Sequence, residues 1–254
     1  MKVLVIGDIH CRKFWKEAIN KYSKDVDKVI FLGDYIDPYY NELKENPDSM
    51  ECDDFYDVDS NLMMLDDIVS LKKKEPLKYI LLTGNHTDSY IWSDFSAPTR
   101  TDEQNWNTYH KFFTENLIYF NLVYVIDNVI FSHAGITKEW LSYINLLPDD
   151  IITAAKTLMD TDLSNFNPNI ISTIGWFRGG YGAGSCEWAD IREHIEKVID
   201  PVLNEFIGKG YDGVFQVFGH TQLKAPLICD KWACLDCRKA FIVNTETHEC
   251  KDCI

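Results

Sequence analysis

The chain has 254 residues and a formal net charge of −15, from 25 basic and 40 acidic side chains. This charge disfavours a surface that coats nucleic acid, because such surfaces need clustered Lys and Arg. No stretch reaches the roughly 20 apolar residues of a membrane helix, and the N-terminus lacks a leader with a long apolar core. We therefore expect a cytoplasmic or otherwise intracellular protein, viral proteins included, and a single domain over residues 1–254.

Short apolar runs rich in Val, Ile and Leu predict buried strands, because each run ends at Gly, Ser or a polar loop. They cover residues 2–6, 28–32, 78–82, 129–131 and 214–218. Amphipathic patterns predict helices over residues 13–22, 61–73, 103–115, 138–145, 149–158 and 191–206. The alternation of strands and helices indicates an α/β layered fold. Two β-hairpins are predicted, one from 122–127 with 129–131 and one from 232–236 with 240–244.

Two long segments, residues 38–60 and 87–102, have neither a helical nor a strand pattern. Long segments of this kind inside a compact domain are usually functional or disordered. We expect substrate specificity to lie in these two segments, because binding residues gather on loops.

Metal-capable side chains follow the predicted strands at the points where the strands end. In chain order they are Asp8 and His10, Asp34 and Asp37, Asn85 and His86, His133, and His220. Any one of these motifs is more simply a tight turn or a hydrogen-bonded histidine. Five in series, each beside Gly or another small residue, favour one shared site, because the carboxyl ends of strands in α/β sheets face the binding crevice.

The mixture of oxygen and imidazole ligands suits Mn, Fe or Zn better than Ca or Cu(I). A carboxylate that bridges two cations offsets their mutual repulsion, and such a cation pair holds the attacking and leaving oxygens of a phosphoryl transfer. Asp34 is the candidate for this bridge.

The ordered motifs Gly-Asp-x-His, Gly-Asp-x-x-Asp, Gly-Asn-His, Ser-His-Ala-Gly and Gly-His-Thr span residues 7–221 and resemble the calcineurin-like metallophosphoesterases. Small bacterial and phage members that resemble protein phosphatases show the closest similarity. The resemblance implies a four-layer α/β/β/α sandwich with two mixed β-sheets and a dinuclear metal centre at the strand ends.

The same resemblance implies roles for individual residues. The first metal would be held by Asp8, His10 and Asp34, and the second by Asp34, Asn85, His133 and His220. A hydroxide that bridges two divalent ions, with Mn favoured, is the implied nucleophile. His86 is the implied general acid, and Asp37 the residue that orients it.

The chain departs from the family pattern near the substrate. Gln222 stands where many phosphodiesterases and nucleases of the family have a second His, which favours the phosphatase branch. The sequence after Asp37 lacks the arginine of that branch. Residues 176–179 resemble a Trp-x-Arg element, so Arg178 is the leading candidate for binding phosphate, with a surface ion pair as an almost equal interpretation. Weaker candidates are Arg12 and Arg100.

A cysteine-rich tail at about residues 229–254 follows these motifs. Cys234, Cys237, Cys250 and Cys253 have the spacing of a structural zinc site. The same segment suits a closing β-hairpin in which the cysteines are small buried residues, and this packing interpretation is preferred. Redox pairing of the thiols stays open.

The motifs together predict a metal-dependent phosphatase, favoured as a phosphomonoesterase. The alternatives are a phosphodiesterase or nuclease on the same scaffold, a non-catalytic metal-binding interaction scaffold, and a nucleic-acid binder that uses a C-terminal zinc ribbon. Retention of all six implied ligands argues against lost catalysis. The phosphorylated substrate, whether a protein, a nucleotide or a small molecule, is left open.

Overall fold

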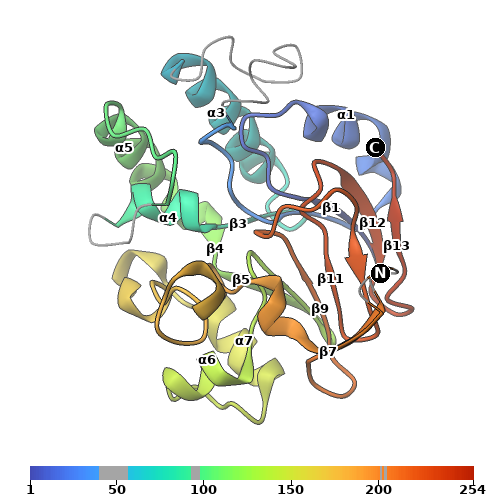
Figure 1. The fold of residues 1–254 in the computed structure, drawn as a ribbon. Helices are drawn as coiled ribbons and strands as arrows, with labels where there is room; N and C mark the ends of the chain where they lie inside the picture. The colour runs from blue at the N-terminus through green and yellow to red at the C-terminus, as the bar shows by residue number, and fades with distance from the viewer. Residues whose placement is uncertain (40–56, 93–97, 201, 203–204) are drawn as a thin grey trace.

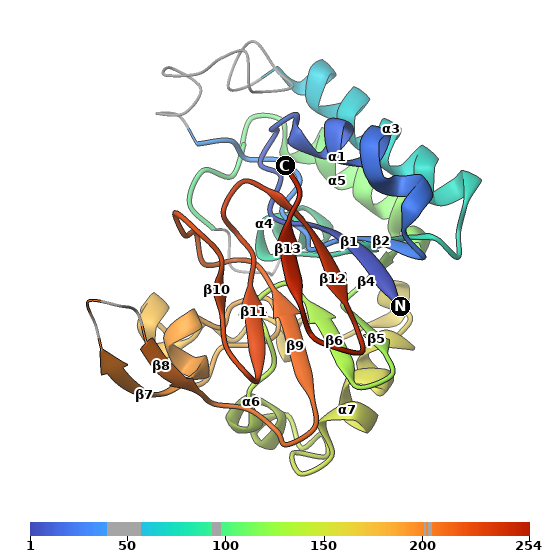
Figure 2. The same cartoon turned by 90° about the vertical axis from the view of Figure 1, so that its right-hand side faces the viewer.

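The computed structural model describes residues 1–39, 57–92, 98–200, 202 and 205–254. Two mixed β-sheets lie face to face, and helices cover their outer faces (Figures 1 and 2). This is the predicted α/β/β/α arrangement. The part of the chain that the structure describes contains no helix long and apolar enough to cross a membrane.

The first sheet has the order β13-β12-β1-β2-β3-β4. Its strands are β1 (Lys2–Ile6), β2 (Lys28–Phe31), β3 (Tyr79–Leu82), β4 (Phe120–Asn121), β12 (Ala240–Asn244) and β13 (Cys250–Asp252). Strands β1 to β4 run parallel, whereas β12 is antiparallel to both β1 and β13. The parallel strands therefore end at one common edge.

The second sheet has the order β10-β11-β9-β6-β5. Its strands are β5 (Val123–Ile126), β6 (Val129–Ser132), β9 (Phe215–Phe218), β10 (Leu227–Ile228) and β11 (Trp232–Cys234). The predicted hairpin of β5 and β6 is confirmed, and β6, β9 and β11 run parallel. A small additional sheet pairs β7 (Ile195–Asp200) with β8 (Glu205–Gly208).

The described α-helices are α1 (Phe14–Tyr22), α3 (Val58–Lys74), α4 (Asn85–Ile91), α5 (Trp106–Asn116), α6 (Lys138–Tyr143) and α7 (Ile151–Met159). Short 3₁₀ turns lie at Ser23–Asp25, Leu117–Tyr119, Leu163–Asn165, Pro168–Ile170, Trp176–Arg178 and Ile191–His194. Side-chain oxygens of Asp57, Thr137 and Asp150 cap three of the helices by accepting backbone N–H groups of the first turn.

Alternation along the central strands builds the core. In β1, Val3 and Val5 face the second sheet and pack with residues such as Phe131 and Val217. Leu4 and Ile6 of the same strand point to the opposite face and belong to the cluster that includes the helix residues Trp15 and Met64. Because successive side chains of a strand point to opposite faces, a continuous apolar run supplies both interfaces.

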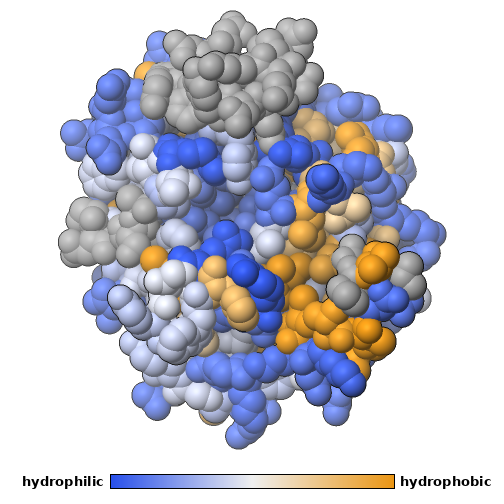
Figure 3. All heavy atoms as spheres, viewed as in Figure 1, coloured by the Kyte–Doolittle hydropathy of each residue, from blue (hydrophilic) through white to orange (hydrophobic). Residues whose placement is uncertain are grey.

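The predicted helix over 191–206 is wrong. This segment forms a 3₁₀ turn followed by β7 and β8. The spacing of its apolar residues fits a helix, but the β-branched Ile195, Val198 and Ile199 favour a strand, and Pro201 in the sequence cannot continue a helix. The hairpin exposes apolar side chains, Val198, Ile199 and Ile207 among them. An apolar patch lies in the lower right of Figure 3, where Figure 1 places β7.

The predicted hairpin of 232–236 with 240–244 is also wrong, although both strands exist. β11 joins the second sheet beside β9, whereas β12 joins the first sheet beside β1 and forms its hairpin with β13. Helix α4 occupies the start of the predicted irregular segment 87–102. Most of the other predicted irregular segment, 38–60, lies outside the described residues.

Candidate metal centre

The loops that follow the strands are held together by backbone hydrogen bonds at one edge of the two sheets. The N–H groups of Ile9 and His10 donate to the carbonyl of Asp34 at 3.0 and 2.8 Å, which ties the loop after β1 to the loop after β2. The N–H of Gly219 donates to the carbonyl of His133 at 2.7 Å, which ties the loops after β9 and β6. The five predicted motifs thus lie around a single crevice.

Several residues of these loops have left-handed backbone conformations. The φ angles are 43° at His10, 46° at Asp34, 62° at Asp37 and 63° at His220. Non-glycine residues rarely adopt positive φ. These conformations turn the chain sharply where each strand ends and direct the side chains inward.

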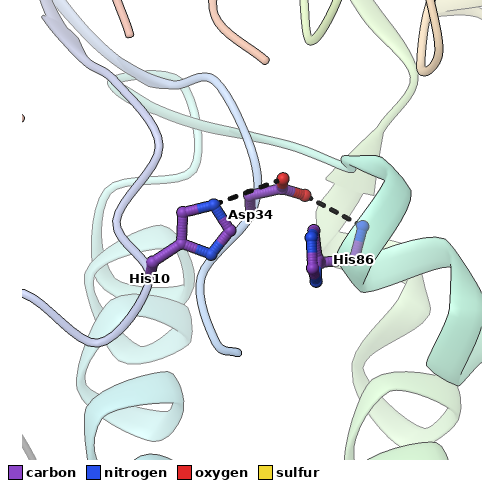
Figure 4. A group of neighbouring side chains, drawn as sticks. All are labelled: His10, Asp34 and His86. Atoms are coloured by element: carbon purple, nitrogen blue, oxygen red, sulfur yellow. Dashed lines mark hydrogen bonds and ion pairs between the residues drawn. The ribbon is translucent and has the colours of Figure 1, made fainter. Parts of the chain in front are cut away.

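Asp34 lies at the centre of the site (Figure 4). Its Oδ2 lies 3.6 Å from Nε2 of His10 and 3.4 Å from Nε2 of His133. Its Oδ1 accepts the backbone N–H of His86 at 3.0 Å. A single carboxylate therefore contacts the motifs of β1, β3 and β6 at once.

Two groups of metal-capable side chains share Asp34. One contains His10, Asp34 and His86, the other Asp34, His133 and His220, and in each group the ligand atoms lie within 4.8 Å of one another. Asn85 adds an amide oxygen 3.0 Å from Nε2 of His133, and Nδ1 of His220 lies 3.1 Å from the same nitrogen. All these side chains are buried.

The hydrogen bonds of the two central histidines leave Nε2 as their ligand atom. Nδ1 of His10 lies 2.8 Å from the carbonyl of Ile36, and Nδ1 of His133 lies 2.8 Å from the carbonyl of Leu32. A carbonyl accepts only, so each Nδ1 carries a proton, and Nε2 is the ring nitrogen that faces Asp34 and is placed to bind a cation. Bonds of this kind orient metal-ligating histidines in proteins.

Electrostatics favour a cation between these groups. Burial raises the pKa of the Asp34 carboxyl, but the neighbouring His133 and His86 outweigh burial and hold the pKa well below its usual value. Burial lowers the pKa of His133, but Asp34 and Asp8 outweigh it and raise that pKa well above the usual value. The buried carboxylates thus attract positive charge, which a divalent cation supplies in place of a proton. The donor set therefore fits divalent metal ions.

Asp8 lies beside both groups without belonging to either. Its two carboxylate oxygens accept the backbone N–H of His220 at 3.2 and 3.0 Å. Burial, with Asp236 next in size, raises the pKa of Asp8 well above its usual value. A Cβ on Gly219 would lie 2.1 Å from an oxygen of Asp8, so a glycine is required for this approach.

The predicted acid and its orienting residue lie together. Nδ1 of His86 lies 2.6 Å from Oδ2 of Asp37, and the hydroxyl of Tyr90 donates to the other Asp37 oxygen at 2.7 Å. Nη2 of Arg100 lies 3.2 Å from Nε2 of His86. Because a guanidinium only donates, Nε2 of His86 accepts this bond, and the proton of the ring lies on Nδ1 toward Asp37.

Arg178 and Arg100 both line the cavity of about 340 Å³ that contains His10, Asp34 and His86. The face in Figure 3 is hollowed near its centre, where hydrophilic residues gather. Nε of Arg178 pairs with Asp190 at 3.1 Å, and its Nη2 donates to Thr221 at 3.0 Å. Arg178 is thus both an ion-pair partner and a cavity residue.

Arg100 is the more deeply placed of the two arginines. Its Nε donates to the carbonyl of Asp37 at 3.2 Å, and its guanidinium stacks 3.6 Å from the ring centroid of Tyr39. No carboxylate in the described part of the chain forms an ion pair with it. Arg12, the other weak candidate, instead donates from Nη1 to the backbone carbonyl of Ile9 at 3.2 Å.

Sequence patterns had not singled out two polar residues of the site. Asp236 is buried beside Asp8 after the end of β11, and burial raises its pKa to about 6. Like the predicted aspartates, Asp236 lies just after the end of a strand. Tyr90 lies four residues after His86 on α4, a spacing that places both side chains on one helix face.

The four C-terminal cysteines do not gather into a metal-capable group in the structure. In the described part of the chain, every group of three or more metal-capable side chains is one of the two groups around Asp34. The thiol of Cys234 donates to the carbonyl of Gly219, and that of Cys253 to the carbonyl of Ala240. Burial raises the pKa of both Cys237 and Cys250 to about 12. The preferred packing interpretation agrees with these contacts.

Known proteins are similar to this chain in fold and in family. Among solved structures, the chain is similar to a cold-active protein tyrosine phosphatase, with a TM-score of 0.54 and 18% identity over 96% of this chain and 74% of that one. A protein serine/threonine phosphatase from Saccharomyces cerevisiae matches with a TM-score of 0.45 and 14% identity, covering 100% of this chain and 80% of the other. No curated protein matches. The model of the family described as calcineurin-like phosphoesterase matches residues 1–223. The chain belongs to the calcineurin-like phosphoesterase family.

Proposed function

We propose that the protein is a phosphomonoesterase with a dinuclear metal centre and a bridging hydroxide as its nucleophile. The first cation would be held by Asp8, His10 and Asp34, and the second by Asp34, Asn85, His133 and His220. The observation that carries this proposal is the position of Asp34, which is shared by both groups of metal-capable side chains. When bound, the cations would lower the pKa of water and neutralise charge on the phosphate.

The residues around the centre would handle the proton. His86 is proposed to protonate the leaving oxygen from Nε2, and Asp37 to hold the ring through Nδ1, as supported by their 2.6 Å contact. In the structure Arg100 donates a hydrogen bond to Nε2 of His86. When the substrate binds, the guanidinium of Arg100 would turn to the phosphate oxygens and free Nε2, which would take a proton from solvent water and later give it to the alkoxide.

Two arginines support the preference for a monoester. The terminal phosphate of a monoester is a dianion, and guanidinium groups match its oxygens in charge and geometry. Arg100 and Arg178 both line the metal cavity. Gln222 stands where many phosphodiesterases and nucleases of the family have a second His, and this difference also favours a phosphatase.

Manganese is the proposed metal, with Fe and Zn as alternatives from the same ligand chemistry. The proposed substrate is a phosphorylated molecule. Three expectations stay predictions: the single-domain organisation over 1–254, the likeness to small bacterial and phage phosphatases, and the cytoplasmic location.

A metal titration tests the proposal. Protein stripped of metal would be titrated with Mn²⁺ and assayed in parallel with p-nitrophenyl phosphate and bis-p-nitrophenyl phosphate. We expect metal-dependent turnover with the monoester preferred, and two Mn²⁺ bound per chain. Preference for the diester would replace the proposal with a phosphodiesterase, and failure to bind Mn²⁺ would contradict the metal centre itself.

A further inference from the structure

Tyr39 lines the metal cavity two residues after Asp37, whose backbone is left-handed. The centroid of its ring lies 5.2 Å from that of His10, with the two ring planes at 83°. The guanidinium carbon of Arg100 lies 3.6 Å from the centroid of Tyr39, and that of Arg12 lies 5.4 Å from it. One half-buried ring thus lies against a proposed metal ligand and two cations.

The backbone of Arg100 is held in place by its neighbours. Its φ angle of 75° belongs to a turn in which the hydroxyl of Thr101 donates to the carbonyl of Pro98 at 2.9 Å. The N–H of Asp102 donates to the hydroxyl of Tyr90 at 2.6 Å, which ties this turn to helix α4. The start of the arginine side chain is therefore fixed, and the position of its guanidinium depends on the groups that the guanidinium meets.

Three groups meet the guanidinium of Arg100. Its Nε donates to the carbonyl of Asp37 at 3.2 Å, its Nη2 donates to Nε2 of His86 at 3.2 Å, and its charge lies over the ring of Tyr39. Burial raises the pKa of the Tyr39 hydroxyl, so the ring stays neutral and attracts the cation through its π face. The ring therefore adds no negative charge that would compete with a phosphate for Arg100.

The contact between Arg100 and His86 has to break in the proposed reaction. A protonated His86 donates from Nε2, and a guanidinium also only donates, so the two cations would repel each other at 3.2 Å. The contact with Tyr39 can persist, because attraction to a ring face does not depend on the direction in which the N–H groups point. Tyr39 therefore gives the guanidinium a surface on which it can turn.

We infer that Tyr39 is a positioning residue, whose ring holds the guanidinium of Arg100 over the metal cavity while its N–H groups turn from His86 to the phosphate. This inference rests on the proposed function and adds to it a residue that acts through Arg100. The sequence agrees with it, because Pro38 and Tyr39 stand where the phosphatase branch has an arginine, and the ring of Tyr39 attracts a different arginine to the cavity.

Substitution of the ring tests the inference. Tyr39→Leu and Tyr39→Met remove the aromatic face and keep an apolar side chain, whereas Tyr39→Phe keeps the face. With the Mn²⁺-loaded protein and p-nitrophenyl phosphate, we expect KM to rise about tenfold in the first two variants, the effect of one partly buried cation–π contact. The value of kcat should stay within about twofold, because this leaving group needs little protonation. An unchanged KM in both variants, or an equal rise in Tyr39→Phe, would overturn the inference.

A double substitution separates this role from an effect of Tyr39 on its own. In Arg100→Ala, the further change Tyr39→Leu should leave KM unchanged, because the ring then has no guanidinium to hold. A second rise of about tenfold in that background would overturn the inference. Tyr119→Leu is the matched control and should leave KM unchanged, since Tyr119 is a half-buried tyrosine that lies 5.1 Å from Nζ of Lys73 and does not line the metal cavity.

Metal binding distinguishes a role through Arg100 from a role through His10, whose ring also lies against Tyr39. Calorimetric titration with Mn²⁺ should give the same stoichiometry and Kd for Tyr39→Leu and the unmodified protein. Weaker Mn²⁺ binding by the variant would show that the ring supports the metal ligand instead, and would overturn the inference.

The outcome is separable from that of the proposed function. If p-nitrophenyl phosphate is not hydrolysed, the proposed function fails, and calorimetric binding of inorganic phosphate to the Mn²⁺-loaded protein still decides the inference. A Kd about tenfold weaker in Tyr39→Leu and restored in Tyr39→Phe would support it. An unchanged Kd in Tyr39→Leu, or no phosphate binding by the unmodified protein, would overturn it.

Discussion

Nδ1 of His86 and Oδ2 of Asp37 lie 2.6 Å apart, and both groups are buried at the ends of adjacent parallel strands. The carboxylate fixes the ring so that Nε2 faces the cavity. Burial raises the pKa of Asp37, and the hydrogen bond from His86 opposes that effect. The two side chains therefore depend on each other for charge and orientation.

Asp37→Asn should reduce kcat most for substrates whose leaving oxygen most needs to be protonated. We expect a loss of about 10²-fold with a phenyl phosphate, whose leaving oxygen is basic, and a much smaller loss with p-nitrophenyl phosphate. The check is a plot of log kcat against leaving-group pKa for both proteins, with His86→Asn as the reference. If the variant has the same slope as the unmodified protein, Asp37 does not act through the acid.

Arg100→Ala should raise KM for phosphate monoesters and lower kcat/KM by about 10–100-fold, the effect of losing one charge-assisted hydrogen bond. Arg178→Ala should act less strongly, because Asp190 already pairs with that guanidinium. Arg100→Lys is the matched variant and should recover only part of the loss, since an ammonium cannot form the bidentate contact. A larger effect at Arg178 than at Arg100 would reverse this assignment.

Removal of metal should destabilise the fold. Bound cations stabilise the native state by mass action, about 2.7 kcal/mol at a hundredfold excess over Kd, which corresponds to roughly 5–10 °C in Tm at this chain length. Differential scanning fluorimetry with and without EDTA measures this shift. Asp34→Asn should abolish the response to Mn²⁺, because both groups lose their shared ligand. An unchanged Tm after addition of EDTA, in protein shown to contain metal, would contradict this prediction.

His194 should make stability depend on pH. Burial lowers its pKa to about 4, and the carbonyl of Ala134, 3.2 Å from Nε2, opposes this only partly. In the unfolded chain the imidazole has a pKa near 6.5. The contribution of His194 to the free energy of unfolding is therefore complete above that pH and is lost as the pH falls toward 4. At pH 5 the loss is about 2 kcal/mol.

The measurement is urea unfolding at pH 7 and pH 5. His194→Gln keeps a donor for Ala134 and removes the titration, so its loss of stability between the two pH values should be smaller by about 2 kcal/mol. His110→Gln, at a partly exposed helix position, is the control. Equal losses in His194→Gln and the unmodified protein would exclude this role.

The positions of the site residues could be predicted because they obey a local rule. Each predicted ligand follows a short apolar run, and the parallel order of the sheet then brings the ends of the strands together. Asp236 obeys the same rule after β11. Arg100 does not, because its place depends on a left-handed turn with φ of 75° that no periodicity records.

Strand pairing was harder to predict than strand existence. β11 and β12 are close in sequence and are both short apolar runs, which also fits a hairpin. Their true partners, β9 and β1, are set by which apolar faces pack between the two sheets. Register of this kind depends on long-range packing, so local patterns do not determine it.

The left-handed residues at the strand ends lower the stability of the fold, and they are also residues of the proposed site. A non-glycine residue in this conformation costs of order 1 kcal/mol, and His10, Asp34, Asp37 and His220 all adopt it around one crevice. Glycine at any of these positions would relax the backbone and remove a side chain of the proposed site. If the proposed roles hold, substitutions that relieve this strain would raise stability and lower activity together, so engineering for stability is better directed to the opposite ends of the same strands.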